Sequence, residues 1–205
     1  MASRSAVLAR SVGLLAVSAA VFIVGCGAPA VVPEDRFYRL SLDAPAARAS
    51  DAVLPGTLGV ARFRADGLTK SRAIVYSDAA QPLVARQYHY HHWIEVPPRL
   101  LQEEMVSYLR GAGVARQVVA AGAGPAPDYL VEGTIRRFEH VRTEGGSAVA
   151  VDIELQLRQR STGAVTLVKE YARSVPADGH GMYEAARAFS RAVSGVYGEF
   201  LRDLR

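Results

Sequence analysis

The most constraining feature of this sequence is a strict alternation of apolar and polar residues between Ala148 and Gln159. Successive side chains of a β-strand point to opposite faces, so a period of two predicts a strand with one buried and one wet face. Antiparallel sheets commonly leave one face in water. We therefore predict a half-buried antiparallel strand. Its apolar row is Val149, Val151, Ile153, Leu155 and Leu157, and its other row is Ala150, Asp152, Glu154, Gln156 and Arg158.

The C-terminal segment can cover the apolar side of such a sheet. Its apolar residues recur at steps of three and four, the spacing of one helix face. A second helix is predicted from Val96 to Gly113, because prolines are tolerated in a first helical turn and glycines commonly end a helix. The C-terminal stripe consists of Met182, Ala185, Phe189, Val193, Val196, Phe200 and Leu204.

Further strands are predicted along the chain, and the two around 80 should form a hairpin. Composition predicts a loop over Asp43–Gly56. With no internal repeat, we predict one α+β domain over residues 36–205: a mostly antiparallel sheet with two helices packed on one face. The additional strands are Arg36–Leu42, Thr57–Ala65, Ser71–Ser77, Leu83–Ile94, Ala115–Ala120, Asp128–Val141 and Ala164–Val175.

The only cysteine, Cys26, follows a segment typical of an export signal. Arg4 and Arg10 supply positive charge, a 15-residue stretch without charge follows, and a small residue precedes the thiol. A bilayer-spanning helix needs roughly 18 or more apolar residues. We therefore predict a signal peptide over residues 1–25. The alternative is an uncleaved membrane anchor with a stray cysteine.

The residues before the thiol, Ile-Val-Gly-Cys, resemble the lipobox of bacterial lipoproteins. This resemblance implies that the Cys26 thiol receives a diacylglycerol and that the chain is cut before it and acylated on the new amine. Two or more acyl chains give stable anchoring, at ~0.8 kcal/mol per buried methylene. Residues 26–35, rich in Pro and Ala, would then be a lipidated tether.

The charge of the remaining chain is close to balanced. Removing 25 of the 205 residues leaves 180, and it takes away two of the 24 basic residues and none of the 20 acidic ones. The balance is then 22 basic to 20 acidic residues. No dense Lys/Arg patch is present, so we expect no nucleic-acid partner. With a single cysteine, the domain must be stabilised by packing and not by internal disulfides.

The strongest candidate for chemistry is the histidine pair His89 and His91, which would share one face of a strand. A zinc site needs a third or fourth ligand, and His140 and His180 lie at no spacing that recruits them. The alternative is a strand whose aromatic residues pack beside the following helix. The sequence also lacks a nucleophile elbow and a phosphate-binding glycine loop. We therefore expect no metal, no cofactor and no enzymatic activity.

The polar row of the alternating strand has two interpretations. Asp152, Glu154, Gln156 and Arg158 are most simply the wet side of a sheet. The alternative is that this side meets a partner.

Four stretches in order carry a family resemblance: the lipobox at Cys26, Phe37–Leu42, His92–Gly113 and Asp128–His140. Together they resemble the ABC-type transport auxiliary lipoproteins. The resemblance implies a non-catalytic envelope component that works beside an ABC transporter and a periplasmic mammalian-cell-entry (MCE) domain protein, moving lipids between inner and outer membranes. Gly27 follows the lipidated cysteine, and in enterobacterial lipoproteins a residue other than Asp at that position implies the outer membrane.

Two other functions stay open at this level. One is a structural outer-membrane lipoprotein that assists assembly of another envelope complex, and the other is a metal-dependent hydrolase built on His89 and His91. Monomer and homo-oligomer are both compatible with the sequence. Genes for an ABC permease, an ATPase and an MCE protein adjacent to the gene of this protein would favour the transport role.

Overall fold

The computed structural model describes residues 32–45, 52–122, 124 and 126–205. The predicted signal peptide and its lipid-attachment residue, Cys26, lie outside these ranges. Within them, Asp35–Arg205 belongs to one compact unit. None of the described helices is long and apolar enough to cross a membrane.

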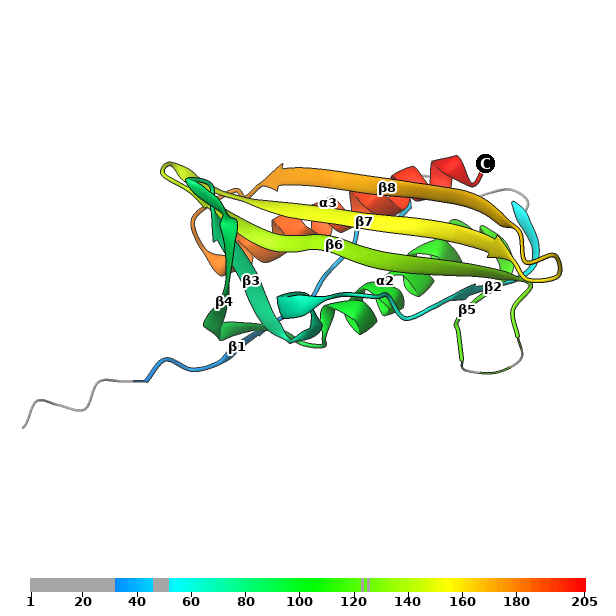
Figure 1. Ribbon diagram of the computed structural model, residues 1–205, viewed down its shortest axis with the longest axis horizontal. Helices are drawn as coiled ribbons and strands as arrows, with labels where there is room; N and C mark the ends of the chain where they lie inside the picture. Colours follow the sequence, from blue (N-terminus) through cyan, green and yellow to red (C-terminus); the bar gives the residue numbers. More distant parts are fainter. Residues whose placement is uncertain (1–31, 46–51, 123, 125) are drawn as a thin grey trace, which may run out of the picture. The chain divides into compact units, whose positions relative to one another are not determined.

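The described elements confirm the predicted α+β fold, with an eight-stranded sheet and two α-helices (Figure 1). In chain order they are β1 (Arg36–Tyr38), β2 (Leu54–Val60), the 3-10 helix η2 (Gly67–Lys70), β3 (Ala73–Asp78), β4 (Gln81–Trp93), α2 (Pro97–Ala112), β5 (Ala115–Ala120), β6 (Tyr129–Thr143), β7 (Gly146–Gln159), β8 (Val165–Pro176) and α3 (Met182–Asp203).

Strands β6, β7 and β8 form an antiparallel meander in which β8 is an edge strand of the sheet. Ile153 of β7 lies opposite Ile135 of β6 and Tyr171 of β8, and all three are buried. The alternation predicted for Ala148–Gln159 is confirmed, since its whole apolar row is buried. Of the opposite row, only Ala150 is buried. Its methyl side chain has no polar group that would lose hydrogen bonds to water.

On the edge of β6 that faces away from β7, two strands pair with β6 one after the other along its length. The sheet therefore forks at this edge (Figure 1). β2 pairs parallel to the N-terminal end of β6, with Leu58 opposite Tyr129, and β3 pairs parallel to the C-terminal end, with Val75 opposite Glu139. β5 continues the sheet beyond β2, while β4 and then β1 continue it beyond β3. The sheet is mixed. Most of its paired residues are antiparallel, as predicted, because β6–β7, β7–β8 and β3–β4 are the long ladders, while β1–β4, β2–β5, β2–β6 and β3–β6 are shorter parallel pairs.

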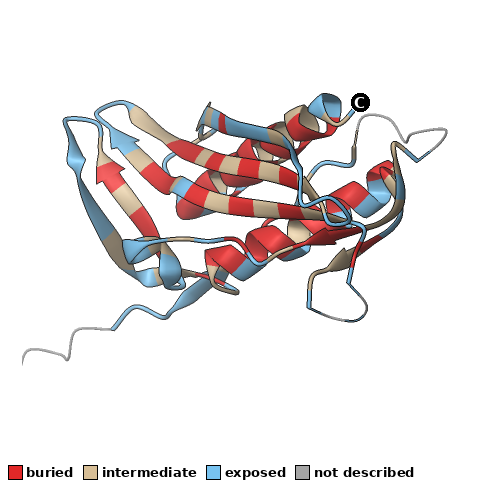
Figure 2. Ribbon diagram, turned by 45° about the vertical axis from the view of Figure 1, so that its right-hand side comes forward, coloured by how far each residue is buried: buried red, intermediate tan, exposed pale blue. Residues whose placement is uncertain are grey.

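Both helices pack on the same face of the sheet, as predicted (Figure 2). α3 covers β7 and β8, and α2 lies against β2 and β5. The predicted stripe of α3 is buried as far as Phe200. The ring of Phe189 packs against those of Trp93 and Phe138, with centroids 5.0 and 4.7 Å away. One aromatic cluster thus joins α3 to β4 and β6.

The end of α2 was predicted correctly, and its geometry explains why. Gly113 adopts a left-handed conformation with φ of 66°, which glycine tolerates because it lacks a Cβ. The N–H of Gly113 donates to the Arg110 carbonyl at 3.1 Å, and that of Val114 donates to the Leu109 carbonyl at 3.5 Å. These bonds form a Schellman motif, which satisfies carbonyls that the helix end leaves free.

The first strand is shorter than predicted. We expected Arg36–Leu42, but β1 ends at Tyr38. Beyond this point the chain leaves β4 and turns to α3, where the N–H of Ser41 donates to Ser190 Oγ at 3.1 Å. A contact with a helix distant in sequence therefore replaces the strand pairing.

Candidate functional site

The outer face of β6 and β7 carries the polar row that the sequence singled out. Asp152, Glu154, Gln156 and Arg158 lie along β7, flanked by β6 and β8. Both helices lie behind the sheet, on its other face (Figure 1). The outer face is thus the broad polar surface of the described domain.

Three of these four side chains are held by partners on β6. An Arg136 guanidinium nitrogen donates to Glu154 Oε2 at 2.7 Å. Glu132 accepts from Gln156 Nε2 at 2.6 Å and from Arg158 Nε at 3.3 Å. Exposed ion pairs contribute only about 0–1 kcal/mol each. Their main effect here is to fix the direction of the side chains.

Asp152 lies beside a more buried cluster of charges. Glu139 is 9% exposed and accepts from Arg137 Nε at 2.6 Å and from Ser77 Oγ at 3.0 Å. Burial raises the pKa of the Asp152 carboxyl, while the facing Arg137 acts in the opposite direction. These contacts tie β3 to β6, which is a structural role.

The histidine-rich part of β4 departs from regular strand geometry. β4 has more residues than β3 between two of their paired positions, so it bulges at this point. His91 Nδ1 shares a hydrogen bond with the Tyr38 hydroxyl at 2.9 Å, and its ring meets Tyr88, whereas His89 is exposed. Among the described residues, no three His, Cys, Asp or Glu side chains are grouped to hold a metal ion.

Tyr88 also contacts a buried histidine that the sequence analysis did not assign to a cluster. The Tyr88 hydroxyl lies 2.9 Å from Nδ1 of His140, which is 4% exposed. His140 Nε2 has no hydrogen-bond partner among the described residues. Burial, with smaller effects of Arg142 and His91, lowers the pKa of His140 from 6.5 to about 4. The ring is therefore neutral near pH 7.

The sheet opens on the outer face where it forks. We predicted a strand over Thr57–Ala65, but β2 ends at Val60. The chain then runs beside β6 as far as a single bridge between Arg64 and Thr134, and leaves the sheet for η2. Within the described chain, residues 136–138 of β6 pair with neither β2 nor β3.

A bulge in β6 coincides with this opening. Ile135 lies opposite Ile153, but the next pair joins Arg137 to Asp152, so Arg136 is the extra residue. Bulges redirect side chains and are over-represented next to functional sites. Here the bulge places the exposed Arg136 beside Glu154, at the edge of the opening.

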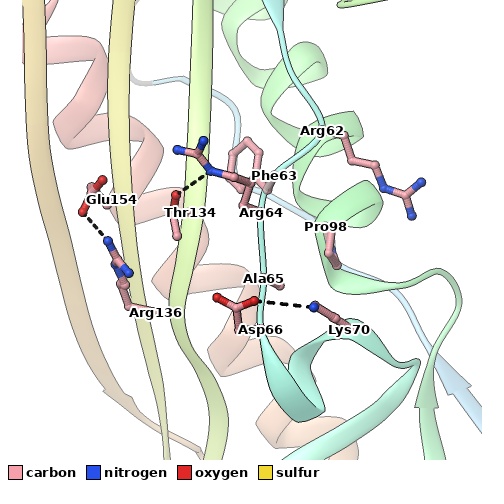
Figure 3. A pocket seen from close by; sticks show the side chains of 10 residues that line it. All are labelled: Arg62, Phe63, Arg64, Ala65, Asp66, Lys70, Pro98, Thr134, Arg136 and Glu154. Atoms are coloured by element: carbon pink, nitrogen blue, oxygen red, sulfur yellow. Dashed lines mark hydrogen bonds and ion pairs between the residues drawn. The ribbon is translucent and has the colours of Figure 1, made fainter.

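A hollow of about 620 Å³ occupies the opening, and we refer to it as the fork hollow. Figure 3 shows Arg64, Thr134, Arg136 and Glu154 gathered on one side of it. Four cations and two carboxylates are among its lining residues. The lining consists of Arg62, Phe63, Arg64, Ala65, Asp66, Lys70, Pro98, Thr134, Arg136 and Glu154.

Of these lining residues, only Glu154 was a candidate predicted from the sequence. Arg62 and Arg64 fell within the predicted strand Thr57–Ala65, where alternating charges indicate only a wet face. Arg64 and Thr134 are 70 residues apart in sequence. Only the fork of the sheet brings them together, so no local pattern could have identified the site.

The comparisons with known proteins agree with this architecture. Residues 38–199 match a sequence model of the ABC-type transport auxiliary lipoprotein component, which is more than half of the chain. The chain belongs to this lipoprotein family. The resemblance inferred from the sequence is thus confirmed. As a member, this auxiliary lipoprotein is a component of ABC-type transport anchored at a membrane of the cell envelope. A search of the curated proteins found no match.

Solved structures share the fold of this auxiliary lipoprotein. Protein XCC0632 from Xanthomonas campestris is 20% identical, with a TM-score of 0.69 over 81% of this chain and 92% of its own. An uncharacterised protein is 14% identical, with a TM-score of 0.67 over 84% of this chain and 100% of its own. At these identities the likeness shows the fold alone.

Proposed function

We propose that this auxiliary lipoprotein is a non-catalytic component of an ABC/MCE-type system that moves lipids between the inner and outer membranes. Acyl chains on Cys26 hold it to the outer membrane, and the domain docks to a periplasmic MCE-domain protein. The observation that carries the proposal is the helix-free outer face, whose polar side chains are already held by contacts such as Arg136 to Glu154. A pre-ordered surface loses little conformational entropy when it binds.

The contacts on this face also support docking in preference to catalysis. Glu132, Glu139 and Glu154 each accept a hydrogen bond from an arginine. A general acid or base must be able to reach a proton of the substrate. Carboxylates engaged with arginines are better suited to hold a polar surface in shape.

The tether limits where the partner must be. The Pro/Ala-rich stretch Ala28–Glu34, seven residues of the tether, spans at most ~25 Å when fully extended, and the whole tether 26–35 spans at most ~36 Å. A domain held so close to its membrane cannot reach across the periplasm. The MCE protein must therefore extend to it, and the docking face must remain accessible when the acyl chains are inserted.

A site-specific crosslinker tests the docking face. A photo-crosslinker in place of Glu154, in cells that carry the native operon, should trap the MCE protein. The matched control is Arg187, which is exposed on α3. If Glu154 traps only lipid or peptidoglycan, or if both positions trap the MCE protein equally, the outer face is not the docking surface.

A charge reversal tests the same face in solution. Glu154→Lys removes the ion pair with Arg136 and should slow association with the MCE protein, because rim charges act mainly on association rate. Glu103→Lys is the control, since Glu103 also pairs with an arginine, Arg99, at 2.8 Å, but on α2. No binding of the purified MCE protein to the unaltered chain would favour the alternative, a structural lipoprotein that assists assembly of another envelope complex.

A further inference from the structure

We propose that the fork hollow is a binding site for a phosphate group. The first argument is its charge. Arg62, Arg64, Lys70 and Arg136 line it together with only two carboxylates, so its formal charge is +2. A phosphate monoester carries about −1.5 to −2 near pH 7 and matches this excess. The carboxylate of a single acidic side chain would leave about half of the +2 charge of the hollow uncompensated.

The second argument is that the excess positive charge of the hollow is not neutralised by carboxylates of the protein. Arginines elsewhere on β6 and β7 have carboxylate partners: Arg137 pairs with Glu139, and Arg158 with Glu132. In the described chain, Arg62 and Arg64 form no ion pair with a carboxylate, and both are exposed. The hollow is therefore the place on this face where guanidinium groups are free to bind an anion.

The remaining two cations can also turn to a ligand. Lys70 lies 3.5 Å from Asp66, and the two side chains are 63% and 95% exposed, so this pair is weak. Arg136 is held by Glu154 at 2.7 Å, at the bulge that points it to the hollow. A dianion competes well with one carboxylate for a guanidinium, because guanidinium–phosphate pairs are commonly bidentate.

The third argument is that the backbone under the two free arginines is firmly held. The Arg64 N–H donates to the Gly133 carbonyl at 2.7 Å, and the Arg64 carbonyl accepts from Ile135 at 2.8 Å. Phe63, between the arginines, is 3% exposed and packs on Gly133. Arg62 and Arg64 therefore project from a fixed segment, and binding would order little more than their side chains.

Thr134 adds a neutral hydrogen-bonding group at the same place. Its hydroxyl accepts a long hydrogen bond, 3.4 Å, from Arg64 Nε, and it lies on the side of the hollow where Arg64 and Arg136 gather (Figure 3). A hydroxyl can donate to a phosphate oxygen without adding charge. The phosphate is either a free anion of the periplasm or the terminal monoester of a lipid headgroup, since both present a phosphate with a charge of about −2 to these residues.

Calorimetry on the full chain in a neutral detergent tests the site. The probes, at constant ionic strength, are inorganic phosphate and glycerol 3-phosphate, both close to dianionic at neutral pH, and glycerophosphoglycerol, a diester with a single negative charge that should bind more weakly. Binding should weaken about tenfold in Arg62→Gln and in Arg64→Gln, the effect of one charge-assisted hydrogen bond. Arg116→Gln, which removes an exposed cation of β5 outside the hollow, should have no effect. Tighter binding of glycerol 3-phosphate than of inorganic phosphate identifies a lipid headgroup, the reverse identifies the free anion, and tightest binding of the diester would contradict the charge argument.

A variant that should increase phosphate affinity separates an effect on binding from an effect on folding. Glu154→Gln removes the carboxylate that competes for Arg136, so phosphate should bind several-fold more tightly, whereas Glu103→Gln on α2 should change nothing. A purely structural role of the ion pair would not increase affinity. The proposal is overturned if no probe binds at millimolar concentration, or if the arginine variants keep their melting temperature and bind as the parent does. This test needs no partner protein, so its outcome is independent of the proposed docking.

Discussion

Acid should destabilise this domain through the buried histidine His140. Its pKa is about 4 in the folded chain, against 6.5 for an unperturbed histidine. The unfolded chain therefore binds a proton at a higher pH than the folded one. The stabilising contribution is complete above pH 6.5 and is lost as the pH falls toward 4. A shift of 2.5 units corresponds to at most about 3 kcal/mol, at ~1.36 kcal/mol per unit.

The surroundings of His140 explain why its pKa is lowered and not raised. The ring is 4% exposed, Tyr88 is hydrogen-bonded to its Nδ1, and Nε2 has no partner among the described residues. A proton added there would place a buried charge close to Arg142 and His91, both of which oppose it. In the described part of the chain, burial, Arg142 and His91 all act against the charged ring, so protonation should favour unfolding.

The assay is urea unfolding of the parent and of His140→Gln at pH 7 and at pH 4.5. The variant should be less stable at pH 7, because it loses packing and the Tyr88 contact. Its free energy of unfolding should fall less on acidification, by about 2–3 kcal/mol. Carboxylates titrate in both chains and cancel in the comparison. His89→Gln, at an exposed position of β4, is the control and should follow the parent. Equal pH dependence in the parent and His140→Gln would refute this reasoning.

Three further predictions concern packing and anchoring. Gly133→Ala would place a Cβ 2.8 Å from ring carbons of the buried Phe63, so we expect a loss of about 1–3 kcal/mol in chemical unfolding, and Phe63→Leu should recover part of it. Phe200→Asp would bury an unpaired charge at a position with 0% exposure, and should prevent folding as judged by circular dichroism; a native spectrum would show that the α3 stripe is not core. Cys26→Ala should release the protein from membranes and abolish labelling by palmitate, and a variant that stays membrane-bound, with no label in the parent, would contradict lipidation.

Elements with a strong local pattern could be predicted from the sequence. The period of two in β7 and the three-and-four spacing of α3 each determine one face, and the apolar residues predicted for those faces are buried, apart from Leu204 at the end of α3. The glycine stop of α2 was predictable for a similar reason, because the Schellman motif needs only the residues at the helix end. In each case, the residues that form the element also carry its signal.

The features that depend on distant pairing could not be predicted in this way. β1 ends early because Ser41 contacts Ser190 on α3, and β2 ends early because the chain leaves the sheet at the fork. The bulge in β4 breaks the alternation that would have placed His89 and His91 on one face. Each deviation follows from a tertiary contact that competes with regular strand pairing.

In the segment 62–64 at the fork, side chains alternate between the core and the surface. Phe63 turns inward, its N–H donates to the Pro98 carbonyl of α2 at 3.2 Å, and its ring covers Gly133. The flanking Arg62 and Arg64 turn to solvent and line the hollow. The bond to α2 and the Arg64 backbone bonds to β6 therefore hold this segment between helix and sheet, so the contacts that bury Phe63 also set where Arg62 and Arg64 leave the backbone.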